Sequence, residues 1–172
     1  MTRRVIIGVL LALGAAISIW FVVQGANRPA NPYFRPAVKG FDEQAFSIEA
    51  RGAPRTGRAR CALLAATTEQ LSRGLMGRRD LAGYDGMIFR FDTEAIRPFT
   101  MRGTLIRLSI AWFDIEGNLV DQTEMTPCRD RVSCPTYSAN RPYRYALEVA
   151  RGGLRRLGVA AGAHITLGGG CA

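Results

Sequence analysis

Glu148 is the residue of this sequence whose surroundings most clearly suggest chemistry. It lies in the segment 143–149 (YRYALEV), whose alternation of side chains predicts a strand. One face of that strand would carry Tyr143, Tyr145, Leu147 and Val149. Glu148 would point to the opposite face. A carboxyl group there is either ion-paired with Arg79 or Arg102, which would hold the sheet together, or it is a polar group in a ligand pocket.

The four cysteines are predicted to form two disulfides. Cys128 and Cys134 are six residues apart in a Pro-containing loop, and this short spacing favours their pairing. Cys61 and Cys171 would then join the two ends of the domain. Neither spacing is the C-x-x-C of a redox motif, and the lone His164 supplies no zinc knuckle. Structural disulfides indicate an oxidising compartment.

The sequence offers little else for catalysis or for a cofactor. No Ser or Cys stands in a nucleophile elbow, and GLMGRR lacks the residues of a phosphate-binding loop. Thioethers of exported proteins can bind Cu(I), which prefers sulfur. The internal methionines are Met76, Met87, Met101 and Met125. They are spread over four elements, which favours core packing over a copper site. We therefore expect no metal and no cofactor.

The charge distribution of the chain shows no nucleic-acid footprint. The net charge is +9, and Lys39 is the single lysine beside 22 arginines. Residues 61–172 hold fourteen arginines against eleven acidic residues, so this part is only mildly basic. Nucleic-acid binding would need Lys and Arg clustered on one face with aromatic residues between them. We expect no nucleic-acid partner.

The N-terminus predicts a membrane anchor. Val5–Val23 is an uncharged, almost wholly apolar run of 19 residues, long enough for a helix to span a bilayer. Arg3 and Arg4 precede it, so residues 1–4 would form a cytoplasmic stub and the rest of the chain would lie outside. The alternative is a signal peptide, with secretion after cleavage, although the exit VVQGA has no clear small-x-small site.

The remaining chain predicts a Pro- and Arg-rich linker over 24–60 and one globular domain over 61–172. The segment 41–50 is expected to be a short ordered element within the linker. Thr67 and Gln70 predict a capping box, and Gly74 predicts the end of the short helix. Residues 115–118 predict a hairpin turn. A second short helix is expected at 154–157. Strands are predicted at 60–66, 86–91, 105–114, 119–125, 143–149 and 164–167. The expected fold is mainly β (β-rich α+β), a small barrel or sandwich of six to eight short strands with two short helices.

The order of several motifs resembles the bacterial and archaeal family known only as domain of unknown function 192. The matching stretches are RGLMGRRDLAGYDGMIFRF, FTMRGTLIRLSIAWFDIEGNLV and PYRYALEVARGGLRRLGVAAG. The resemblance spans about residues 61–167 and implies a small β-rich fold that is often exported or membrane-anchored. It implies no activity. The chain departs from the family pattern, because Thr100, Gly103 and Ser109 replace the usual Trp, Asn and Asp, and Ala163 replaces a second Asp.

Two hypotheses of function follow. The first is a non-catalytic module outside the membrane that binds an envelope polymer, a small ligand or a protein. The second is an enzyme of unfamiliar type that uses Glu148 with Arg79 and Arg102. Both predict one surface built from distant segments of the chain: Arg79, Met87, Met101, Arg102, Thr104 and Glu148. A common cleft containing Glu148, Arg79 and Arg102 would favour the enzyme or pocket hypothesis.

Overall fold

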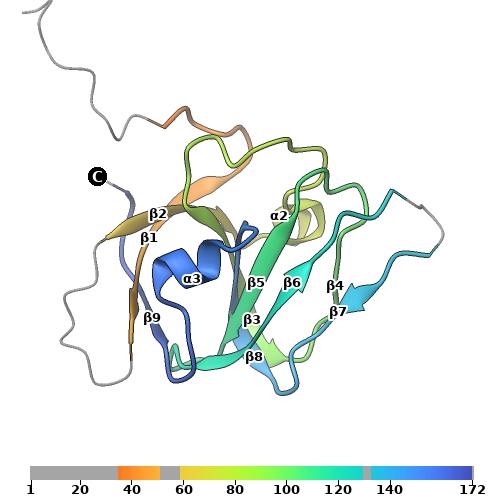
Figure 1. Cartoon of the computed structure of the whole chain (residues 1–172). Coiled ribbons are helices and arrows are strands. Elements are labelled where there is room, and N and C mark those ends of the chain that lie inside the picture. The colour runs from red at the N-terminus through yellow and green to blue at the C-terminus, as the bar shows by residue number, and fades with distance from the viewer. Residues whose placement is uncertain (1–34, 51–58, 130–132, 172) are drawn as a thin grey trace, which may run out of the picture. The chain divides into compact units, whose positions relative to one another are not determined.

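The fold is built on a strongly curled seven-stranded sheet with two short helices (Figure 1). The computed structural model describes residues 35–50, 59–129 and 133–171. The sheet strands are β1 (Asp42–Glu49), β2 (Arg60–Ala65), β3 (Gly86–Ala95), β5 (Leu108–Phe113), β6 (Leu119–Met125), β8 (Tyr143–Ala150) and β9 (His164–Leu167). The helices are α2 (Thr68–Arg73) and α3 (Gly153–Leu157), and β4 (Phe99–Thr100) and β7 (Thr136–Tyr137) form a small second sheet.

The order of the strands in the large sheet is β6-β5-β8-β3-β2-β1-β9. The pair β2–β3 is parallel, because α2 carries the chain back to the starting edge, and the other pairs are antiparallel. The two outer strands approach each other at one end, where Asn118 forms a β-bridge with His164. The sheet is therefore a partly closed barrel, and the prediction of a mainly β fold with two short helices is confirmed.

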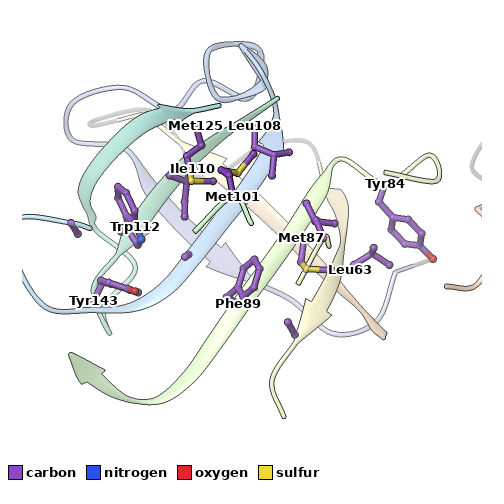
Figure 2. Close-up of a cluster of buried hydrophobic side chains, with 14 of the residues drawn as sticks. Leu63, Tyr84, Met87, Phe89, Met101, Leu108, Ile110, Trp112, Met125 and Tyr143 are labelled. Carbon is purple, nitrogen blue, oxygen red and sulfur yellow. The ribbon is translucent and has the colours of Figure 1, made fainter. Parts of the chain in front are cut away.

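Both faces of the sheet are buried, which explains why its central strands are apolar throughout. All six residues of β5 are buried, although one of them is Ser109. On one face, α3 packs against β5 and β8 and covers a cluster that contains Leu64, Ile88, Leu147 and Val149. On the other face lies a cluster that contains Leu63, Met87, Ile110, Trp112 and Tyr143 (Figure 2). This second face carries the candidate site.

Both predicted disulfides are confirmed. Cys61 is bonded to Cys171 and Cys128 to Cys134, with 5.7 Å between the Cα atoms of each pair. The Sγ atoms of Cys61 and Cys171 also lie close to the Glu43 carboxylate. Because both sulfurs are used in the disulfide, this group offers no thiolate to a metal ion.

Several expectations about the elements need correction. The linker does not extend to residue 60, because β1 lies inside the sheet between β2 and β9. The ordered element expected at 41–50 is this strand. The strand expected at 105–114 is shorter, at Leu108–Phe113, and β4 and β7 were not expected. Tyr143 does not share a face with Leu147 and Val149, because the pairing of β3 and β8 is irregular between Arg90 and Ala95.

The predicted anchor Val5–Val23 lies outside the described residues, as do the stub at 1–4 and part of the predicted linker. Within residues 35–50, 59–129 and 133–171, no helix has the length and apolar character needed to cross a membrane.

Candidate functional site

Glu148 is a buried carboxyl group on the apolar face opposite α3. Its direct cross-strand neighbours are Met87 on β3 and Ile110 on β5, so its side chain shares their face of the sheet. It is 5% exposed, and within the described part of the chain it makes no ion pair and no side-chain hydrogen bond. Loss of solvation raises its pKa to about 8. The predicted ion pair with Arg79 or Arg102 is therefore wrong, and the carboxyl is mostly protonated at neutral pH.

Glu148 lines a cavity of about 540 Å³ between α2 and the sheet. The walls come from α2 and the turn after it, from β3, from residues 97–100 and from the buried Thr104. The apolar lining residues are Leu71, Leu75, Met76, Phe89, Phe91, Pro98 and Phe99, and the hydroxyl groups come from Thr68, Ser72, Thr100 and Thr104. An apolar cavity with a few polar groups and one strongly perturbed carboxyl has the composition of a small-molecule site.

Helix α2 forms one wall of the cavity, and local sequence fixes both of its ends. The Thr67 hydroxyl accepts a hydrogen bond from the Gln70 amide at 3.3 Å, and the Gln70 side chain accepts one from the Thr67 amide at 3.0 Å. Gly74 ends the helix with a φ of 45°, and its amide donates to the Gln70 carbonyl. A Cβ atom at Gly74 would lie 3.1 Å from the ring of Phe89, so glycine also lets the helix end approach β3.

Two arginines line the cavity, Arg97 with a hydrogen-bonded guanidinium and Arg73 with an exposed side chain. The Arg97 guanidinium donates to the backbone and side-chain oxygens of Thr93 at 3.0 Å each, and it lies 4.6 Å from the ring centre of Phe91. Arg73 lies 5.4 Å from the ring centre of Phe41. No carboxylate of the described residues pairs with either guanidinium within salt-bridge distance. The cavity therefore combines two positive charges with a neutral carboxyl.

The structure divides the predicted surface into three places. Thr104 and Glu148 line the cavity. Arg79 and Arg102 are exposed and line a separate groove, which Thr104 also borders. Because the two arginines do not share the cavity with Glu148, the arrangement required by the enzyme hypothesis is not formed.

The other two predicted residues, Met87 and Met101, are core residues. They are 0% and 1% exposed and belong to the cluster drawn in Figure 2, which also contains Met125. Their thioethers pack among Leu63, Phe89, Leu108 and Ile110, as methionine does when it fills a core. The fourth methionine, Met76, is 42% exposed and lines the cavity. Three of the four methionines thus lie in one buried cluster, where core packing accounts for them.

Arg73, Arg97 and the aromatic wall are site residues that the sequence did not indicate. Phe89 and Phe91 are two residues apart in the predicted strand 86–91, so their common face was predictable. Phe99 packs edge-on against Phe89, with 5.0 Å between ring centres. Arg97 follows a polar stretch without periodicity, and only the folded loop brings it to the cavity.

Comparison with known proteins identifies the family. Residues 51–167 match the family model of domain of unknown function 192 (DUF192), which is described as "Uncharacterized ACR". The chain belongs to the DUF192 family. No protein of curated function matches it. The resemblance seen in the sequence is thereby confirmed.

Two solved structures share the fold of this DUF192 chain. One is a protein from Sinorhizobium meliloti 1021 that is named only provisionally, as a transcription regulator; it is 22% identical, with a TM-score of 0.63, and the match covers 76% of this chain and 98% of that one. The other is a protein of unknown function from Novosphingobium aromaticivorans DSM 12444; it is 23% identical, with a TM-score of 0.60, and the match covers 81% and 98%. These likenesses support the fold.

Three of the four positions at which this chain departs from the DUF192 pattern can be placed in the structure. Thr100 is exposed and lines the cavity, where it is much smaller than the usual Trp. Gly103 has a φ of 69°, a conformation that Gly and Asn both tolerate, so its replacement of Asn preserves the backbone. The buried Ser109 hydroxyl donates to Glu124 at 2.7 Å and accepts from the Gly152 amide at 2.9 Å, which holds the start of α3.

Proposed function

We propose that this protein is a membrane-anchored, extracytoplasmic binding module whose ligand occupies the cavity between α2 and the sheet. The observation that carries the proposal is Glu148, a largely buried carboxyl that has no hydrogen-bond or ion-pair partner among the described residues and lines an open cavity. A buried polar group costs free energy unless it is hydrogen-bonded, and a bound ligand would supply the bond.

The lining favours an amphipathic organic anion of small size. Its apolar or aromatic part would pack against Phe89, Phe91 and Phe99, and its carboxylate, sulfonate or phosphate would bind near Arg73 and Arg97. The protonated Glu148 would donate a hydrogen bond instead of repelling the anion. Among the described residues that line the cavity, Glu148 is the only carboxyl, and there is no histidine or cysteine. This composition favours binding over catalysis.

The location outside the cytoplasm has independent support. Two disulfides suit an oxidising compartment, and the apolar segment Val5–Val23 follows Arg3 and Arg4. An alkaline phosphatase fused to the C-terminus, which is active only outside the cytoplasm, should be active in cells. Activity of a C-terminally fused reporter that works only in the cytoplasm would contradict this part of the proposal. Sequencing the mature N-terminus would separate an anchor from a cleaved signal peptide.

Ligand entry can be tested with 1-anilinonaphthalene-8-sulfonate (ANS), a fluorescent aromatic anion. We expect the folded full chain in neutral detergent to bind ANS in a saturable manner above the detergent background. The variant Thr100→Trp should weaken binding at least tenfold, because its ring would fill the cavity. Thr123→Trp is the matched control, since Thr123 is an exposed strand threonine outside the cavity lining, and it should bind like the native chain. Equal binding by both variants would reject the cavity as the site.

The same titration tests the role of Glu148. Above pH 8 the ionised carboxyl would repel the sulfonate, so the affinity of the native chain for ANS should fall between pH 7 and pH 9. Glu148→Gln keeps a neutral hydrogen-bonding group and should retain its affinity over this range. An identical pH dependence in both proteins would exclude Glu148 from the binding site.

A further inference from the structure

A groove that adjoins the cavity at Thr104 is lined by four arginines. Arg79 comes from the turn after α2, Arg102 and Arg107 from the segment before β5, and Arg129 from the loop of the Cys128–Cys134 disulfide. The groove has a volume of about 850 Å³, and Leu105, which is 46% exposed, also lines it. Distant parts of the sequence thus bring four positive charges to one place.

Backbone contacts hold these segments together. Arg102 and Cys128 form a β-bridge, and the Cys128 amide donates to the Met101 carbonyl at 3.3 Å. On the other side, the Gly77 amide donates to the Gly103 carbonyl at 2.9 Å. The backbones that carry Arg79, Arg102 and Arg129 are therefore fixed relative to one another before any ligand binds.

The four guanidinium groups have no acidic partner within the described part of the chain. Other arginines do form ion pairs there, such as Arg60 with Asp85 and Arg151 with Glu124. The described lining of the groove contains no acidic residue, and no ion pair of these four arginines occurs among residues 35–50, 59–129 and 133–171. Like charges gathered without counter-charge repel one another, and a bound anion would relieve that repulsion.

We propose that this arginine groove binds phosphate groups and is a second site, which adjoins the cavity at Thr104 but shares no arginine with it. Guanidinium groups bind phosphate oxygens through paired N–H···O bonds, and one oligophosphate or more than one lipid headgroup could occupy all four arginines. Two sources have this chemistry: the headgroup of an anionic phospholipid and a soluble oligophosphate. The exposed Leu105 adds an apolar contact that only the lipid would use.

The test uses the full chain in neutral detergent and measures the dissociation constants of two probes. Tripolyphosphate represents soluble phosphate, and dihexanoylphosphatidylglycerol represents the lipid, with dihexanoylphosphatidylcholine as its zwitterionic control. The variant Arg79→Gln/Arg102→Gln should weaken binding of the preferred probe at least tenfold. Arg155→Gln/Arg156→Gln is the matched control, since it removes two exposed arginines of α3 with the same charge change, and it should alter binding less than twofold.

Each outcome decides the proposal. Tighter binding of tripolyphosphate assigns the groove to soluble phosphate, and tighter binding of phosphatidylglycerol assigns it to lipid; both support a phosphate site. Equal losses of affinity in the two double variants would show attraction by net charge alone and would overturn the proposal. The proposal would also be overturned if neither tripolyphosphate nor phosphatidylglycerol bound at 1 mM. ANS binding should be unchanged in Arg79→Gln/Arg102→Gln, so failure of the groove and failure of the cavity are distinguishable.

Discussion

Met87 and Glu148 are direct cross-strand partners on β3 and β8, so a carboxyl group and a thioether project side by side from the same face of the sheet. Met87 is wholly buried and Glu148 nearly so, at 0% and 5% exposed. The carboxyl therefore lies against apolar surface on its sheet side and faces the cavity on the other. This environment, and not a neighbouring charge, raises the pKa of Glu148.

The raised pKa predicts that Glu148 destabilises the fold as the pH rises. Its pKa is about 8 when folded and near 4.5 when unfolded, so the folded state binds the proton more tightly. The free energy of unfolding should therefore fall from pH 4.5 upward until about pH 8, by a few kcal/mol in order of magnitude. Glu148→Gln has no such group. Its denaturant midpoint should match that of the native chain at pH 5 and exceed it at pH 9.

The control for this experiment is Glu116→Gln, which changes an exposed glutamate in the turn between β5 and β6. Its unfolding free energy should follow that of the native chain across the pH range. If the difference between Glu148→Gln and the native chain does not change with pH, the folded pKa of Glu148 is not raised.

The two disulfides should contribute unequally to stability. The Cys61–Cys171 bond joins residues 110 apart, and the Cys128–Cys134 bond joins residues 6 apart. In the chain-entropy model, loss of the long link costs about 5 kcal/mol and loss of the short link about 2 kcal/mol. Thermal and denaturant unfolding of the two double Cys→Ala variants measures both costs. A larger loss on removal of the short link would contradict the entropic explanation for this fold.

Gly117 and Gly158 should respond differently to substitution by alanine. Both have left-handed φ angles, 88° and 83°, so alanine costs about 1 kcal/mol of backbone strain at each. A Cβ atom at Gly117 would also overlap the Ile165 carbonyl oxygen and lie 3.0 Å from the His164 ring, whereas one at Gly158 meets nothing within 4 Å. Gly117→Ala should therefore lower the melting temperature considerably more than Gly158→Ala. Equal losses would show that the junction of β6 with β9 is loosely packed.

Local chemistry made some elements predictable from the sequence. Residues close together in the sequence determine the Thr67–Gln70 capping box, the helix end at Gly74 and the last strand at His164–Leu167. In contrast, β1 is flanked by Pro- and Arg-rich sequence, and its partner β9 lies more than a hundred residues away. No local pattern records such a pairing.

The candidate site was predictable only in part, for a similar reason. Strand alternation correctly placed Glu148 on the face opposite Leu147 and Val149. Alternation could not predict where Arg79 and Arg102 lie, because contacts between loops position their segments. One such contact is the hydrogen bond from the Gly77 amide to the Gly103 carbonyl. The burial of Glu148 without a counter-charge follows from the packing around it, which side-chain alternation does not encode.

The strand order has a consequence for the sequence of events in folding. β3 and β5 are neighbours only through β8, and β1 pairs on its second edge with β9. The pairings of β8 with β3 and β5, and of β1 with β9, join strands that are distant in the chain. Such long-range pairings are typical of slow-folding topologies. As the chain is synthesised, the β1-β2-β3 half and the β5-β6 hairpin therefore remain separate until residues 143–150 have been made. The outer edge of β1 stays unpaired longer still, until residues 164–167 emerge.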